Sequence, residues 1–156
     1  MKKFLAAIVI AAAALVGFAA PTQAGLLNIF QPKPKIVATV SLSEQKMYVA
    51  VTDNRGKVRN YAWDVSTGTR GFETPTGKFT PTWLSKDHKS KQYDDAPMPY
   101  AVFFNEGIAV HGTQAVARLG QPASHGCVRL ATENAATFFS LVETYGKFNV
   151  RIVVTS

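Results

Sequence analysis

"YAVFFNEGIAVHG", residues 100–112, contains two apolar runs separated by a short turn sequence. Asn105, Glu106 and Gly107 form the turn, and valine, phenylalanine and isoleucine dominate the runs on either side. Runs of this composition around a turn that contains glycine predict a β-hairpin. The second run ends at His111, so the hairpin would also place an imidazole near the end of a strand.

The segments before this hairpin are also typical of β-strands. Residues 35–51 break at residues 43–45 into two β-branched runs, which predicts a second hairpin. Residues 58–68 are expected to form a third strand. Residues 74–83 contain two prolines, which cannot donate to a sheet ladder, and we expect a turn that leads into an edge segment.

One helix is predicted after the hairpin. Thr132 is the expected N-cap and Gly146 the expected C′ residue, and residues 148–154 are typical of a closing strand. The apolar residues between the caps recur with helical spacing: Ala135, Phe138, Phe139, Val142 and Tyr145. The pattern predicts a mainly β fold, a β-sandwich or partly closed barrel with one α-helix in the C-terminal half.

Residues 84–97 show no apolar period. Three lysines and three aspartates dominate the stretch, which predicts a long surface loop. Loops of this length in a small domain are commonly functional or mobile. His88 lies in this stretch, and we expect its side chain to be solvated.

The N-terminus resembles a secretory signal. Lys2 and Lys3 precede an apolar run from Phe4 to Ala20, and a small-residue exit ends at Ala24. The alternative is a membrane anchor, because a run of this length is near the lower limit for spanning a bilayer. We expect a signal peptide over residues 1–24, an extended lead-in over 25–35, one domain over 36–156, and no stable membrane span after cleavage.

The charge balance is basic, with a formal net charge of +7. This balance is compatible with an anionic partner such as a cell-wall polymer, but a soluble surface that happens to be basic explains it equally well. The basic residues are scattered and form no run of five or more, and no nucleic-acid motif is present. We therefore expect no nucleic-acid partner.

The single cysteine, Cys127, follows a histidine and a glycine in "PASHGCVRL", residues 122–130. A thiol that an imidazole can deprotonate is the minimum unit of thiol nucleophilic catalysis, and either His111 or His125 could act as this base. Gly126 would allow a tight turn that directs N–H groups at a substrate oxygen. Two alternatives stay open: a buried, inert cysteine, and a zinc site that uses His111, His125 and Cys127.

Residues 110–130, "VHGTQAVARLGQPASHGCVRL", resemble the signature of the L,D-transpeptidase catalytic domain, the YkuD-like family. The signature is a His-Gly-Thr followed, some fifteen residues later, by Ser-His-Gly-Cys, an aliphatic residue and Arg. "VSTG" at 65–68 and "TPTGKF" at 74–79 are similar to further family segments, and the resemblance extends over about residues 36–155. Gln114 and Ala115 replace the Asn and Pro of many members, which affects the loop.

The resemblance implies a role for each matching residue. Cys127 would be the nucleophile and His111 the general base, oriented by the Gly112 carbonyl. His125 and Gly126 would shape the turn and, with Cys127, supply oxyanion-hole N–H groups. The substrate-binding residues it implies are Arg129, Ser124 and Thr113; a structural ion pair is an equal alternative for Arg129.

The implied reaction is acyl transfer on peptidoglycan stem peptides. A thioester formed on a tetrapeptide stem with release of D-alanine would pass to an amine to give a 3→3 cross-link. Water, a free D-amino acid or a lysine of an envelope protein are other possible acceptors. The resemblance implies no metal and no cofactor, and we expect a monomer in the periplasm or cell envelope. The alternative functions are an L,D-carboxypeptidase, a zinc-dependent envelope peptidase and a non-catalytic wall-binding protein.

Overall fold

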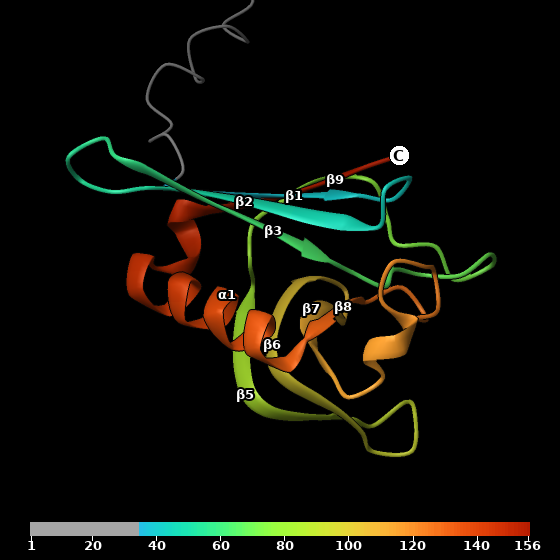
Figure 1. The fold of residues 1–156 in the computed structure, drawn as a ribbon. Coiled ribbons are helices and arrows are strands. Elements are labelled where there is room, and N and C mark those ends of the chain that lie inside the picture. Colours follow the sequence, from blue (N-terminus) through green and yellow to red (C-terminus); the bar gives the residue numbers. More distant parts are fainter. Residues whose placement is uncertain (1–34) are drawn as a thin grey trace, which may run out of the picture. The chain divides into compact units, whose positions relative to one another are not determined.

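A computed structural model describes residues 35–156, and the expected signal peptide and most of the lead-in lie outside this range. The described residues form two β-sheets and one long helix (Figure 1). The five-stranded sheet has the order β3-β2-β1-β9-β4, and the four-stranded sheet has the order β5-β6-β7-β8. The strand bounds are β1 Ile36–Ser41, β2 Lys46–Thr52, β3 Val58–Asp64, β4 Gly77–Phe79, β5 Trp83–Ser90, β6 Ala96–Asn105, β7 Ile108–Thr113, β8 Val128–Ala131 and β9 Val150–Thr155.

The fold is therefore mainly β, as predicted, and its two sheets are not closed into a barrel. Helix α1, Thr132–Tyr145, packs against β6, β7 and β8. Alternate residues of the strands and one face of α1 share a single buried core, which includes Val49, Ile152, Val110, Leu130 and Phe138. One face of the four-stranded sheet packs on this core, and the opposite face of that sheet is available for a site.

Two predicted hairpins and one predicted edge strand are confirmed. β1 pairs with β2 in antiparallel fashion, and β6 pairs with β7 around the turn at Glu106 and Gly107. β4 is an edge strand beside β9. The closing strand begins at Val150, after a short 3₁₀ turn over Lys147–Asn149.

The prediction of a long loop over residues 84–97 is wrong. Residues 83–90 form β5 and residues 96–105 form β6, so only residues 91–95 turn. The stretch lacks an apolar period because many of its side chains are exposed or half-buried, and backbone pairing with β6 makes it a strand. His88 is half-buried, because its ring packs edge-on against Trp83 and Phe103.

The helix begins at Thr132, and Ala131 is its N-cap, so the expected N-cap is wrong by one residue. The Thr132 hydroxyl donates instead to the Thr113 carbonyl, 3.3 Å away, and thus ties the helix to β7. Gly146 ends the helix with φ 79°, as the sequence predicts.

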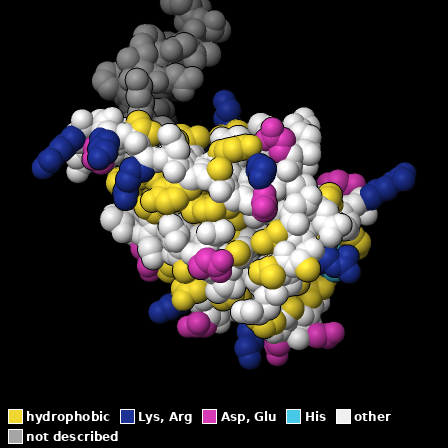
Figure 2. All heavy atoms as spheres, viewed as in Figure 1, with side chains coloured by type: hydrophobic (Ala, Val, Ile, Leu, Met, Phe, Trp, Pro, Cys, Tyr) yellow, Lys and Arg dark blue, Asp and Glu magenta, His cyan; other side chains and the backbone are white. Residues whose placement is uncertain are grey.

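The surface seen in Figure 2 is mixed. Lysine, arginine and acidic side chains are dispersed over it, and apolar side chains gather where β3 faces α1. No helix among residues 35–156 is long and apolar enough to cross a membrane.

Candidate active site

The outer face of the four-stranded sheet brings His111 and Cys127 together. β7 and β8 run parallel, and His111 pairs with Arg129 across them. Side chains two positions apart on a strand point to the same face, so His111 shares this face with Ala109, and Arg129 shares it with Cys127. The imidazole on β7 and the thiol of Cys127, the residue before β8, therefore lie diagonally opposite each other.

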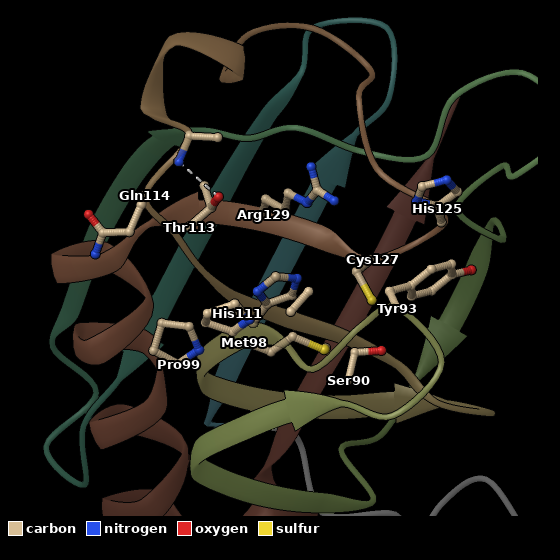
Figure 3. Close-up of a pocket in the computed structure, with 13 residues that line it drawn as sticks. Ser90, Tyr93, Met98, Pro99, His111, Thr113, Gln114, His125, Cys127 and Arg129 are labelled. Atoms are coloured by element: carbon tan, nitrogen blue, oxygen red, sulfur yellow. Dashed lines mark hydrogen bonds between the residues drawn. The ribbon is translucent and has the colours of Figure 1, made fainter.

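A cavity of about 430 Å³ lies over this face. Figure 3 shows the Cys127 sulfur between His111 and Tyr93, with Met98 below and Arg129 on the strand that follows the cysteine. The remaining lining residues are Ser90, Ala96, Pro97, Pro99, Thr113, Gln114, Ala115 and His125. Residues 90–99 of the β5–β6 hairpin make the opposite wall, so a segment expected to be a surface loop encloses the site.

His111 is buried, with 5% of its surface exposed, and its tautomer is fixed. Its Nδ1 lies 2.8 Å from the Gly112 carbonyl oxygen. A carbonyl can only accept a hydrogen bond, so neutral His111 carries its proton on Nδ1 and its Nε2 is free to accept one. Burial lowers the pKa of His111 to about 4. The hydrogen bond with the Gly112 carbonyl opposes this shift, and interactions with Arg129 and His88 lower the pKa by smaller amounts. His111 is thus neutral near pH 7.

Gly112 has a steric reason to be glycine. A Cβ at this position would lie 3.1 Å from Pro99 Cγ and 3.1 Å from the Thr132 Cα. The strand that carries His111 therefore passes closely between the β5–β6 hairpin and the start of α1.

Cys127 is half-buried and forms no disulfide. Its side chain packs against the cluster formed by Met98, Ala101, Phe103 and Ala109. Burial raises the pKa of the Cys127 thiol, while the Ala109 N–H and the Arg129 charge lower it by smaller amounts. The resting pair is consequently a neutral thiol and a neutral imidazole.

The backbone turn before the thiol is held by buried hydroxyl groups. Ser124, 1% exposed, donates to the Cys127 carbonyl at 2.5 Å and accepts from the Gly126 N–H at 3.1 Å. Gly126 itself has φ 108°, a conformation that residues with a Cβ rarely adopt. The Ser124 hydroxyl is committed to this turn, so its position favours a bracing role over the substrate contact expected for it.

Thr74 is a site residue that the sequence analysis did not single out. Its hydroxyl donates to the Gly126 carbonyl at 2.8 Å and accepts from the Gly68 N–H at 2.9 Å. The side chain is 2% exposed. Thr74 and Gly68 lie in the two short segments that the family resemblance includes, which is the one signal that could have indicated their importance.

His125 also lines the cavity, but its ring packs against other aromatic side chains. Its ring is exposed, stacks on Tyr93 with centroids 4.7 Å apart, and meets the edge of Phe72 at 4.7 Å. Within residues 35–156, no group of three or more His, Cys, Asp or Glu side chains is placed to hold a metal ion. His111, His125 and Cys127, which the sequence offered as zinc ligands, do not form such a group.

Arg129 reaches the cavity with its charge unpaired by a carboxylate. Its guanidinium donates to the Ala123 carbonyl at 3.1 Å. The one ion pair in the described part of the chain joins Lys46 and Asp64, so the structural ion pair considered for Arg129 is not present. Thr113 also lines the cavity, and its hydroxyl accepts from the Ala115 N–H at 3.1 Å.

Comparison with known proteins identifies the class of this fold and site. Residues 35–153 match the family model of the L,D-transpeptidase catalytic domain, YkuD. The chain therefore belongs to this family. The match includes every residue of the site described above.

Individual relatives agree with this assignment. The probable L,D-transpeptidase YbiS of Escherichia coli (strain K12) is 27% identical, over 80% of this chain and 56% of that protein. The chain thus spans little more than half the length of the curated relatives it matches.

Solved structures show the same fold. An L,D-transpeptidase from Mycobacterium smegmatis superposes with a TM-score of 0.66 at 23% identity, covering 79% of this chain and 59% of that one. L,D-transpeptidase 3 from Mycobacterium tuberculosis in complex with a faropenem-derived adduct gives 0.65 at 20% identity, covering 79% and 61%.

Proposed function

We propose that the protein is a cysteine-dependent L,D-transpeptidase that forms 3→3 cross-links between peptidoglycan stem peptides. The observation that carries the proposal is the hydrogen bond from His111 Nδ1 to Gly112, which leaves Nε2 unprotonated on the cavity that Cys127 also lines. A base with a free lone pair beside a thiol, in a cavity large enough for a peptide, is the arrangement that thiol acyl transfer requires.

In the acylation step, the Cys127 sulfur attacks the carbonyl carbon that links the third residue of a tetrapeptide stem to the terminal D-alanine. The S–C bond forms while the thiol proton moves to His111 Nε2. The tetrahedral intermediate then collapses, the C–N bond breaks, and the Nε2 proton passes to the leaving amine. A thioester and free D-alanine result.

Proton transfer during attack follows from the neutral resting pair. The thiol pKa is raised and the imidazole pKa is about 4, so a preformed thiolate–imidazolium pair is unfavourable. General-base catalysis of this kind contributes about 10²–10⁴-fold to the rate.

The carbonyl oxygen of the intermediate needs hydrogen-bond donors near the thiol. We assign this role to the N–H groups of the turn at residues 125–127. The Gly126 N–H is held by Ser124 in the resting structure, so the donors of His125 and Cys127 would carry most of the stabilisation. Arg129 and Thr113 would bind polar groups of the donor stem, and the unpaired guanidinium suits a carboxylate of the substrate.

In the second step, the nitrogen of an amine attacks the thioester carbonyl carbon, and His111 Nε2 takes its proton. The C–S bond then breaks, and the Nε2 proton returns to the sulfur, which restores the Cys127 thiol. The side-chain amine of a diamino acid on a neighbouring stem gives the 3→3 cross-link. Water would make the protein an L,D-carboxypeptidase, and a lysine of an envelope protein would make it an anchoring enzyme. We place the reaction in the periplasm, on the basis of the signal sequence expected over residues 1–24.

The test is intact-mass spectrometry with a disaccharide-tetrapeptide donor. We expect D-alanine release and a transient mass increase equal to the disaccharide-tripeptide acyl group, and, when a second stem is added, a cross-linked dimer. Cys127→Ala removes little volume and should abolish both products while the melting temperature stays near that of the wild type. D-alanine release by this variant at a near wild-type rate would disprove the assignment of the nucleophile.

Faropenem gives an independent measurement of the same thiol, motivated by the adduct named for the Mycobacterium tuberculosis relative. One covalent adduct per chain is expected for the wild type and none for Cys127→Ala. Slow alkylation of Cys127 together with no acyl transfer would instead favour a non-catalytic wall-binding protein with a buried, inert thiol.

A further inference from the structure

Trp83 presents one face of its ring to solvent. It lies at the start of β5, and 46% of its surface is exposed. The ring stacks in parallel on Phe103, with centroids 4.1 Å apart and planes 4° apart, and Phe103 is itself buried. His88 packs edge-on against both rings, at 5.4 Å and 4.9 Å. The Trp83 ring is thus supported from behind and from one edge.

A second aromatic ring and a cation lie beside the start of this strand. Phe148 is 81% exposed. The Lys147 ammonium lies 5.3 Å from the centre of the Phe148 ring and donates to the carbonyl of Thr82, the residue before Trp83. We call the surface formed by Trp83, His88, Lys147 and Phe148 the glycan platform.

The platform is continuous with the active-site face. Phe103, on which Trp83 stacks, belongs to the small buried cluster against which Cys127 packs. His88 pairs across the strands with Met98, which lines the cavity. β5 is strongly curved (Figure 1), and this curvature brings His88 back into contact with Trp83. One layer of buried side chains therefore connects the exposed ring with the thiol.

We propose that the glycan platform binds the amino-sugar rings of the glycan strand that carries the stem peptides. The proposal rests on the proposed function, because it extends the substrate from the stem peptide to the polymer. Pyranose rings present faces of C–H groups that pack flat on an aromatic ring, and their hydroxyl and acetamido oxygens accept hydrogen bonds from an ammonium group. A ring already fixed by Phe103 and His88 loses little freedom on binding a flat ligand. Every stem is covalently attached to a sugar, so a sugar site close to the cavity would retain the donor.

Binding is tested with the hexamer of N-acetylglucosamine, without any peptide. The chain has two tryptophans, which makes intrinsic fluorescence a site-specific signal. We expect a saturable change in the wild type and in Trp63→Phe, the control on β3. The change should be absent in Trp83→Ala, and affinity should fall roughly three- to tenfold in Phe148→Ala. Phe148 is so exposed that Phe148→Ala should leave the melting temperature unchanged. The affinity of this variant therefore tests the platform even if Trp83→Ala does not fold.

Kinetics separate the platform from the catalytic site. D-alanine release from a free tetrapeptide should be equal in the wild type and Phe148→Ala. Release from uncross-linked glycan strands at limiting substrate should fall roughly three- to tenfold in the variant. If the wild type releases D-alanine from neither substrate, the proposed function fails and the fluorescence titration alone decides the platform.

Three results would overturn the proposal. The first is the absence of a saturable signal in the wild type, and the second is an equal affinity for the hexamer in the wild type and Phe148→Ala. The third is binding to phosphatidylglycerol vesicles that depends on Trp83 and Phe148 while the hexamer does not bind, which would make this surface a membrane contact.

Discussion

At the scale of single residues, burial moves the pKa values of His111 and Cys127 in opposite directions. The imidazole becomes a weaker base and the thiol a weaker acid, so neither is charged near pH 7. The candidate nucleophile is therefore protonated in the resting site. A thiol held in this form is also less exposed to oxidation and alkylation than a thiolate.

The pH dependence of kcat/KM follows from these values. His111 accepts a proton only when it is neutral, so kcat/KM should fall as the pH falls through about 4. Arg129 lowers both pKa values, so Arg129→Gln should move the acid limb and the ionisation of Cys127 to higher pH. Arg129→Lys keeps the charge and is the control. An acid limb near the ordinary histidine value in the wild type would contradict the buried base.

The two histidines of the signature can be separated in the same way. We expect His111→Gln to lower the rate of thioester formation by about 10²–10⁴-fold. The ring of His125 is exposed and stacked on Tyr93, so His125→Gln should act through the turn and have a smaller effect. Single-turnover acylation measured for both variants checks this, and a larger loss in His125→Gln would reverse the assignment of the base.

Thr74 is expected to support the site without touching the substrate. Thr74→Val keeps the shape of the side chain but leaves the Gly126 carbonyl and the Gly68 N–H without their partner. We expect a loss of about 1–3 kcal/mol in the free energy of unfolding, measured by urea denaturation, and a lower kcat. Thr74→Ser should restore both, and a Thr74→Val protein as stable and active as the wild type would show that the hydroxyl is dispensable.

At the scale of elements, local patterns predict the hairpins and the helix but not how they join. The β6–β7 hairpin and α1 have clear turns and periods, and both are confirmed. The sequence does not predict strand β5, because much of its surface is exposed or half-buried. Its residues pair with β6 but do not alternate between apolar and polar. The N-cap is displaced because the Thr132 hydroxyl bonds β7 instead.

The β6–β7 turn contains a residue in an unfavourable backbone conformation. Glu106 has φ 36° and Gly107 has φ 88°, and two-residue hairpin turns with positive φ at both positions favour Asn-Gly. Glu106→Asn should therefore stabilise the protein by about 0.5–1 kcal/mol. Glu106→Ala removes the same charge without the conformational preference and should give no such gain in thermal denaturation. Equal stability of the two variants would show that the backbone at residue 106 carries no cost.

At the scale of the whole molecule, the candidate site depends on contacts between distant segments. The single thiol makes Cys127 a candidate nucleophile with either His111 or His125 as its base, and sequence reasoning does not choose between the two histidines without the family resemblance. The structure explains the limit, because the parallel pairing of β7 with β8 brings the candidate catalytic residues together, and Ser66 bridges to Arg129 from the loop after β3. Pairings of this kind leave no local signal in the sequence.

The pairing of the first described strand with the last has a consequence for how the chain is made. β9 lies between β1 and β4 and runs parallel to β1, so Ile36 is beside Val150. The chain emerges residue by residue from a ribosome or a translocation pore. The position between β1 and β4 therefore stays empty until residues 150–155, which form β9, have emerged. The five-stranded sheet must then close across nearly the whole length of the domain, which is a slow step in folding. Until residues 150–155 have emerged, β1 and β4 cannot join the same sheet.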